Sequence, residues 1–282
     1  MPLSTTFAAA SIKGYGGGTP GPLVVNSAAG TLYSSALATK NATGTQTDGL
    51  YWLNLPTVGA TLVPCLMNDS WSPGGWMMLL RGLAGSSTFY YGSSHWTSAT
   101  TLNAQPTPIG TAQDAKYHTF NYSPINDLMA RWPDITTNGG SLSYGGCWVW
   151  KQNISGLGYT NSTALNLFTN ASRLFVQDAT SYAGWNNAGA GPTYFSSQTD
   201  VHFYGINYNG GGNGTATRWG FGWNENGGGL FPNGDEGSND VYGGIGTQGG
   251  YINASYNAGD FVSCCCDTCG MNRSARIEVY GR

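Results

Sequence analysis

The residues best suited to chemistry gather in one polar loop of a weakly charged chain. The stretch WNENGGGLFPNGDEGSND supplies Asn224, Glu225, Asn226, Asp235, Glu236, Asn239 and Asp240. Calcium takes about six to eight oxygen ligands from carboxylates, amide carbonyls and backbone carbonyls. Glycine lets the backbone turn its carbonyls towards an ion at little steric cost. The loop therefore predicts a calcium site without EF-hand spacing, and a metal-free solvated turn is the alternative.

Cysteine is concentrated near the C-terminus, where four of the six cysteines lie. The six are Cys65, Cys147, Cys264, Cys265, Cys266 and Cys269. Neighbouring side chains diverge, so three adjacent cysteines do not readily bind one tetrahedral zinc. The Cys-Asp-Thr-Cys spacing of a redox motif lacks a βαβ context. The even number favours at least one disulfide in or onto this cluster, with free thiols or zinc as alternatives.

No catalytic constellation is visible in the sequence. The only histidines are His95, His118 and His202, and the chain lacks the G-x-S-x-G, H-E-x-x-H and P-loop motifs. Carboxylates outside the polar loop are scattered, so a pair of glycosidase acids cannot be argued. We therefore expect no enzyme, and we expect the three histidines to be packed, hydrogen-bonded loop residues.

Composition indicates a neutral, hydrogen-bonding surface. Charged residues make up 9% of the chain, against roughly 25% in ordinary soluble proteins, while glycine alone numbers 44. This balance is typical of extracellular or virion proteins rich in loops and short strands. With 11 basic and 14 acidic residues there is no basic footprint for nucleic acid. The absence of a long apolar run predicts no membrane insertion.

The N-terminal region predicts an arm. It resembles no secretory signal peptide, so we expect assembly into a virus particle in the host cytoplasm, followed by release. Residues 1–47 are small, polar and Gly-rich, with Phe7, Ile12 and Tyr15 as isolated apolar anchors. We expect this arm to become ordered on a partner and to contribute nothing to the fold of the rest.

From residue 48 onwards the pattern predicts an α+β chain with little helix. Apolar and polar alternation or short apolar runs predict strands in DGLYWLNLP (48–56), ATLVPCLMND (60–69), WMMLLRG (76–82), DVHFYGIN (200–207), TRWGFGW (217–223) and ARIEVYG (275–281). Helices are predicted at SPINDLMARW (123–132), with Ser123 as N-cap, and at NSTALNLFTNASRLF (161–175).

The segments DGLYWLNLP, VPCLMND and GGWMMLLRG resemble the opening of the fibrinogen C-terminal-like domain. DAKYHTFNYSPINDLMARW and GGGLFPNGDEGSNDVYGGIGTQGGY are similar to the X-type lectins, or intelectins. The similarity covers residues 48–282 in order. It implies one loop-rich α+β fibrinogen-like domain with a central antiparallel sheet and few short helices, preceded by the arm 1–47. Trp76 should be buried, the strand after it should be central, and disulfides should brace long loops.

The resemblance also assigns roles within the polar loop. Asn224, Glu225 and Asp235 fall on or near calcium-ligand positions of the intelectins, and Glu236 and Asp240 complete the expected set. Gly222 and Asn233 stand where that family has a histidine and a later glutamate, so structural calcium is favoured over chelation of sugar diols. Tyr242 and Tyr251 stand near the aromatic cradle for a glycan, or are ordinary strand residues.

The whole chain is similar to fibrinogen-like structural proteins of phages and large viruses, through SSHWTSATTLN, RWGFGWNENGG and the opening FAAASIKGYGGG. This resemblance implies a virion structural protein, as a fibre, tail-tip or capsid-decorating subunit, which displays a lectin-like domain for host-surface attachment. Expected partners are other virion proteins, a host-surface glycan and copies of the chain, with a trimer favoured. The alternative is a secreted, soluble, calcium-dependent lectin.

Overall fold

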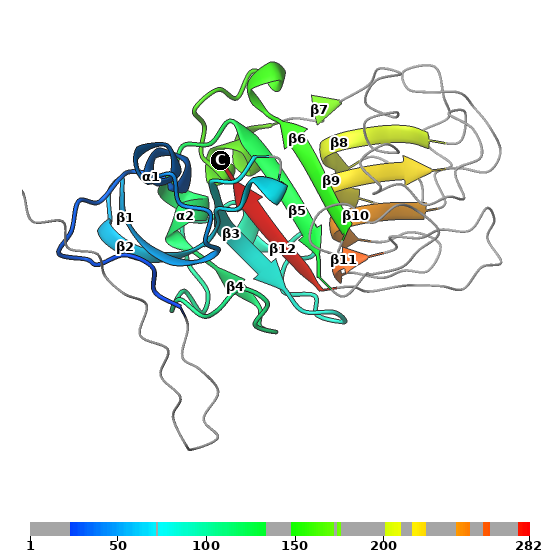
Figure 1. The fold of residues 1–282 in the computed structure, drawn as a ribbon. Helices are drawn as coiled ribbons and strands as arrows, with labels where there is room; N and C mark the ends of the chain where they lie inside the picture. The colour runs from blue at the N-terminus through cyan, green and yellow to red at the C-terminus, as the bar shows by residue number, and fades with distance from the viewer. Residues whose placement is uncertain are drawn as a thin grey trace, which may run out of the picture.

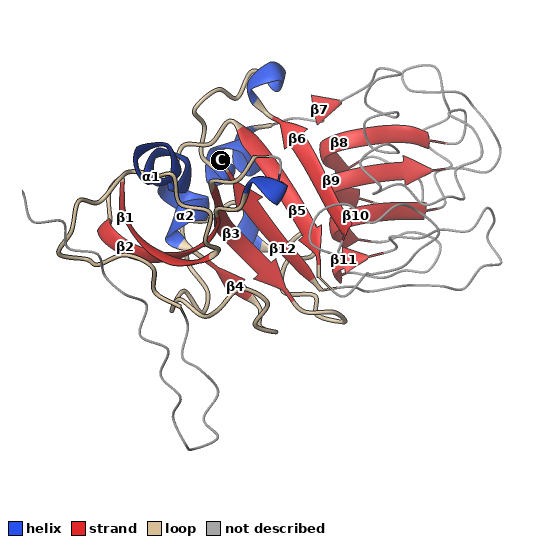
Figure 2. Ribbon diagram, viewed as in Figure 1, coloured by secondary structure: helices blue, strands red, loops and turns tan. Residues whose placement is uncertain are grey.

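The chain forms two antiparallel sheets with a few short helices (Figures 1 and 2). The computed structural model describes residues 23–71, 73–133, 148–171, 174–175, 201–209, 216–223, 241–248, 256–259 and 276–282. The predicted α+β class, mostly antiparallel and rich in loops, is confirmed for these residues. None of the helices in this part of the chain is long and apolar enough to cross a membrane.

The first sheet joins segments from both ends of the described chain. Its strands are β1 (Gly49–Leu55), β2 (Gly59–Leu66), β3 (Trp76–Gly82), β4 (Ala115–Lys116), β5 (Asp127–Trp132), β6 (Trp148–Asn153) and β12 (Ile277–Gly281). The order is β1-β2-β3-β12-β5-β6, and β4 pairs with part of β3. The C-terminal strand β12 therefore lies in the middle, between β3 and β5.

The second sheet lies to the right of the first in Figure 1. Its strands are β7 (Leu174–Phe175), β8 (Val201–Asn209), β9 (Ala216–Trp223), β10 (Val241–Gln248) and β11 (Tyr256–Gly259), in the order β11-β10-β9-β8-β7. The helices are α1 (Ala36–Thr43), α2 (His118–Tyr122) and α3 (Ala164–Asn170), with 3₁₀ turns η1 (Asp69–Trp71), η2 (Ser94–Trp96) and η3 (Ser155–Leu157).

Strand β3 is covered on both of its faces, because every one of its residues is buried. Met77 and Leu79 point into the main core, which also takes in Ile206, Trp219 and Ile245 of the second sheet. On the opposite face lies a smaller group, here called the second-face cluster. Its members are Leu66, Trp71, Trp76, Met78, Ala115, Tyr117, Met129 and Tyr280. The expectation of a buried Trp76, followed by a central strand, is confirmed.

All six predicted strands are present, but the helix predicted over 123–132 is wrong. Residues 127–132 form strand β5, paired with β12 on one side and β6 on the other. A short apolar run fits a buried strand as well as a helix, and pairing on both sides decides between them. Ser123 is the C-cap of α2 instead of an N-cap. The helix predicted within 161–175 is confirmed as α3, with Thr163 as its N-cap.

Residues 23–26 protect the outer edge of β1. The Leu50 N–H donates to the Leu23 carbonyl at 2.9 Å, and the Val25 N–H donates to the Leu50 carbonyl at 2.9 Å. The Asn26 side chain then bonds both backbone groups of Trp52, donating to its carbonyl at 3.0 Å and accepting from its N–H at 2.7 Å. The Asn26 side chain thus takes the place of a neighbouring strand in bonding the backbone of β1 at Trp52.

Helix α1 also belongs to this fold. Ser35 caps its first turn by accepting from the Ala38 N–H, and Ala36 is fully buried in the main core. Leu37 packs closely on Gly75, just before β3. The expectation that the first 47 residues contribute nothing to the fold is therefore wrong for residues 23–47. Residues 1–22, including Phe7, Ile12 and Tyr15, lie outside the described residues.

Candidate functional site

Most of the site residues predicted from the sequence lie outside the described residues. They are Asn224, Glu225, Asp235, Glu236, Asp240, Tyr251, Cys147, Cys264, Cys265, Cys266 and Cys269. The backbone of Tyr242 is part of β10 and pairs with Gly222 of β9. Cys65 is a buried free thiol in β2, and burial raises the pKa of this thiol. Among the described side chains, no group of three metal-ligating residues forms.

Two of the three histidines, His95 and His118, pack on aromatic rings, and the side chain of His202 lies outside the described residues. His95 lies edge-on to Phe89 at 5.6 Å, and His118 stacks on Tyr122 at 6.1 Å. Burial, and then the charge of Lys116, lower the pKa of His95. The two histidines are packed as expected, but neither Nδ1 has a hydrogen-bond partner among the described residues.

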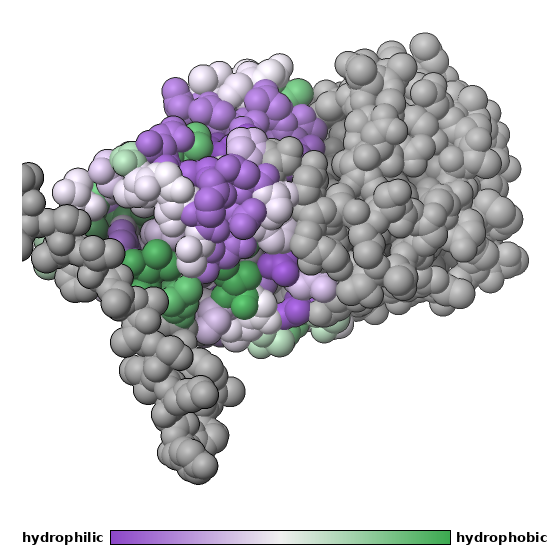
Figure 3. Space-filling view, in the orientation of Figure 1, coloured by the Kyte–Doolittle hydropathy of each residue, from purple (hydrophilic) through white to green (hydrophobic). Residues whose placement is uncertain are grey.

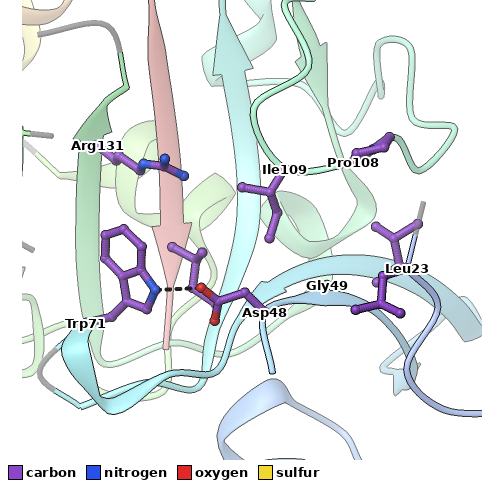
Figure 4. Close-up of a pocket in the computed structure, with 9 residues that line it drawn as sticks. Leu23, Asp48, Gly49, Trp71, Pro108, Ile109 and Arg131 are labelled. Atoms are coloured by element: carbon purple, nitrogen blue, oxygen red, sulfur yellow. Dashed lines mark hydrogen bonds between the residues drawn. The ribbon is translucent and has the colours of Figure 1, made fainter. Parts of the chain in front are cut away.

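A pocket of about 320 Å³ opens beside the second-face cluster, and we take it as the candidate site (Figure 4). It is lined by Leu23, Asp48, Gly49, Leu50, Leu66, Trp71, Pro108, Ile109 and Arg131. This volume is at the lower end of the range for small-ligand pockets, roughly 300–1,000 Å³. The walls come from the N-terminal segment, the start of β1, the end of β2, η1, β5 and the loop before β4.

Asp48 builds one wall of the pocket. Its Oδ1 accepts from the backbone N–H groups of Met67 at 2.6 Å and Asn68 at 2.9 Å, which fixes the chain as it leaves β2. Its Oδ2 accepts from the Trp71 indole N–H at 2.8 Å, the dashed line in Figure 4. Three donors therefore occupy this carboxylate, and its role is to hold Trp71 in place.

Arg131 forms the opposite rim of the pocket, and Trp71 and Glu278 hold its guanidinium in place. Its guanidinium lies 5.2 Å from the centre of the Trp71 ring and pairs with Glu278 at 3.1 Å. Glu278 is fully buried, and it also accepts from the Gly110 N–H at 2.9 Å and the Tyr280 hydroxyl at 2.8 Å. Burial, and then the Glu278 charge, raise the pKa of Tyr280. A buried carboxylate with this many donors is compatible with the apolar sheet.

The loop 107–111 is clamped to the sheet by Arg81. The guanidinium donates to the carbonyls of Pro108 and Thr111, each at 3.1 Å, and its Nε donates to the Tyr117 hydroxyl at 2.8 Å. Arg276 donates to the Gly110 carbonyl from the same side. The loop carries Pro108 and Ile109, so this wall of the pocket is set before any ligand arrives.

Sequence reasoning missed this pocket, although one signal was present. Arg81 ends the apolar run WMMLLRG, and Glu278 interrupts the apolar strand of ARIEVYG. A charge in a buried strand needs partners, so both positions indicate polar networks beside the sheet. The partners themselves come from distant parts of the chain and carry no local pattern.

The pocket is suited to binding an apolar group. Its carboxylate and guanidinium are engaged by Trp71 and Glu278, and the remaining walls are apolar. An apolar group of suitable size would bind by shape and loss of hydrated surface. No family model matches the chain, and no curated protein sequence matches it.

Lys116 is a buried cation outside the pocket, and it allows a test of the electrostatics of the core. Lys116 is fully buried, donates to the Ser98 carbonyl and lies 4.5 Å from the Phe120 ring centre. Burial lowers its pKa to about 8. Below this pH the folded protein holds a buried charge, which lowers its stability. This loss of stability disappears as pH rises towards the lysine pKa in the unfolded chain, about 10.4.

Between pH 7 and about pH 9.5, the wild type should gain about 1–3 kcal/mol of unfolding free energy relative to Lys116→Met, which has no group to titrate at this position. Urea unfolding of both proteins at each pH measures this difference. The hydrogen bond to Ser98 is lost at every pH, so it offsets the two curves without changing their slopes. Parallel curves would contradict the buried charge.

Proposed function

We propose that the protein is a structural subunit of a virus particle, as a fibre, tail-tip or capsid-decorating protein, that displays a lectin-like domain for attachment to the host surface. The neutral, Gly-rich composition and the segments similar to fibrinogen-like virion proteins support this proposal. The two-sheet α+β fold is compatible with a fibrinogen-like domain.

The observation that carries the proposal is the nature of the pocket and its place in the chain. It is apolar, its polar side chains are engaged by the protein itself, and Leu23, which follows residues 1–22 in the sequence, forms part of its wall. Such a site suits contact with protein segments during assembly. Residues 1–22 would dock the subunit to other virion proteins, and the domain would face outward, with a homotrimer as the favoured oligomer.

Within this proposal, the loop 224–240 binds a structural calcium ion and lies near a glycan contact. Trp223 and Val241 are direct partners in the β9–β10 pairing, so the two ends of the loop start from one point of the sheet. That arrangement supports a compact ligand set of Asn224, Glu225, Asp235, Glu236 and Asp240. Tyr242 follows directly in β10, and with Tyr251 it would offer the aromatic contact to a sugar.

Removal of calcium tests the metal proposal. A ligand bound only by the folded state adds about 2.7 kcal/mol at a hundredfold excess over Kd. EDTA should therefore lower the Tm, and Asp235→Ala should abolish that sensitivity. Asp69→Ala is the matched control, because the Asp69 side chain is 58% exposed and its loss should leave the EDTA effect intact. An unchanged Tm of the wild type in EDTA would overturn calcium binding.

The location of the protein tests the proposed function. Mass spectrometry of purified virus particles should find the chain at a stoichiometry of several copies per particle. Its recovery as a free, secreted protein, absent from particles, would instead support the secreted calcium-dependent lectin.

A further inference from the structure

An apolar surface lies where the described chain begins. The consecutive residues Leu23, Val24 and Val25 are 59%, 44% and 36% exposed. One side of this segment pairs with β1, through Leu23 and Val25. Val24 forms the bridge to Leu50, and its own N–H and C=O point to the other side of the segment. This edge has no strand partner among the described residues, and unbroken apolar side chains on such an edge usually indicate a surface that something covers.

This surface is continuous with the pocket, because Leu23 belongs to both. Ile109 packs against the second-face cluster but is itself only partly buried. The cluster is therefore not fully covered where the pocket opens. Figure 3 shows hydrophobic residues gathered in green patches at the lower left of the described surface. The pocket and the exposed segment therefore form one apolar docking surface.

The length and position of the preceding chain indicate what covers it. Twenty-two residues precede Leu23, and residues 16–22 read GGGTPGP, which favours turns and carries no bulky side chain. The nearest large apolar residues upstream are Tyr15 and Ile12. The eight Cα-to-Cα steps from Tyr15 to Leu23 span at most about 29 Å, enough to leave the rim of the pocket and return.

We propose that the segment around Ile12 and Tyr15 docks its apolar side chains into the pocket of its own chain. A tethered segment has an effective concentration in the millimolar range, so it competes well against a second copy. The pocket supplies the apolar partner surface that the segment lacks by itself. This inference concerns the free subunit, and it does not depend on the proposed role in a particle.

Trypsin tests the inference on the full chain, because Lys13 is the only lysine or arginine among residues 1–22. Intact-mass spectrometry follows the loss of residues 1–13 with time. Ile109→Asp places a charge in the pocket and should speed cleavage after Lys13 at least about fivefold. Val58→Asp is the matched control, since Val58 is 36% exposed in the turn between β1 and β2, and should leave the rate unchanged.

Cleavage after Lys40 reports on the fold in the same experiment, because this residue lies in α1. Equal rates at Lys40 in all variants show that the fold is intact, and Ile109→Ala provides a milder change if Ile109→Asp does not fold. Equal rates at Lys13 in the wild type and the pocket variant would overturn the proposal. Protection of Lys13 that fades on dilution would overturn it too, since the occupant would then be a second copy. Neither result depends on whether particles contain the chain.

Discussion

Asn257→Asp is expected to destabilise the protein by about 3–5 kcal/mol at pH 7, and by less as the pH falls. Asn257 is fully buried in β11 and donates to Asp114 at 2.8 Å and to the Leu83 carbonyl at 3.2 Å. An aspartate would set two carboxylates against each other where a donor is needed. Uptake of a proton by one of the two carboxylates relieves this repulsion, so the deficit shrinks on acidification.

The effect is large because Asn257 joins β11 of the second sheet to the segment between β3 and β4 of the first. It accepts from the Phe89 N–H at 2.5 Å, and its backbone N–H donates to the Ser86 carbonyl at 2.8 Å. Asp114 accepts in addition from the Ser86 and Thr88 hydroxyls, at 2.6 and 2.7 Å. Losing Asn257 therefore leaves donors and acceptors unpaired on both sides of the junction.

Urea unfolding at about pH 7.5 and pH 5 measures this prediction. Asn257→Leu should also destabilise, but its deficit should change less with pH than that of Asn257→Asp, because it adds no second carboxylate beside Asp114. The same asparagine-to-aspartate change at Asn41, an exposed position on α1, should have little effect. A deficit below about 1 kcal/mol for Asn257→Asp would show that the junction does not depend on this residue.

Glu278→Leu is expected to cost about 3–5 kcal/mol, because it removes the buried carboxylate that pairs with Arg131 and accepts from Gly110 and Tyr280. It also removes the acceptor of the Gly110 N–H, so the loop 107–111 should exchange its amide hydrogens faster. Urea unfolding and hydrogen exchange followed by mass spectrometry measure the two effects.

Glu278→Gln separates charge from shape at the same position. It keeps the size of the side chain and an acceptor oxygen, and we expect a smaller loss of stability with slower exchange in the loop than in Glu278→Leu. If both variants matched the wild type in stability and exchange, the carboxylate would not be what holds the pocket wall.

The elements that the sequence predicts best are those with a local pattern. Strands β1, β2 and β3 follow from alternation and apolar runs in residues 48–82, and α3 follows from its capping residue. Strand β5 was misread as a helix because its pairing partner β12 comes about 150 residues later. Local pattern contains no information on such a partner, so the centre of the sheet is the part least visible in the sequence.

The N-terminal segment was misread for a different reason. Helix α1 has no apolar stripe, and it contacts the core through small residues, Ala36 and Thr39. The edge of β1 is satisfied by the Asn26 amide, a residue type that usually indicates a turn. The pocket was missed because its nine lining residues come from separate segments, although Arg81 and Glu278 indicated buried polar networks nearby.

Incorporation into virus particles tests the central claim most directly. The comparison is between the full chain and a chain beginning at Leu23, which keeps the cover of β1 and helix α1. Each is produced in an infected host, and its amount in purified particles is measured by mass spectrometry, with circular dichroism confirming that the shortened chain folds. We predict that the full chain enters particles and that the folded, shortened chain does not. Equal incorporation of the two chains, or the absence of both from particles, would contradict a virion subunit docked through residues 1–22.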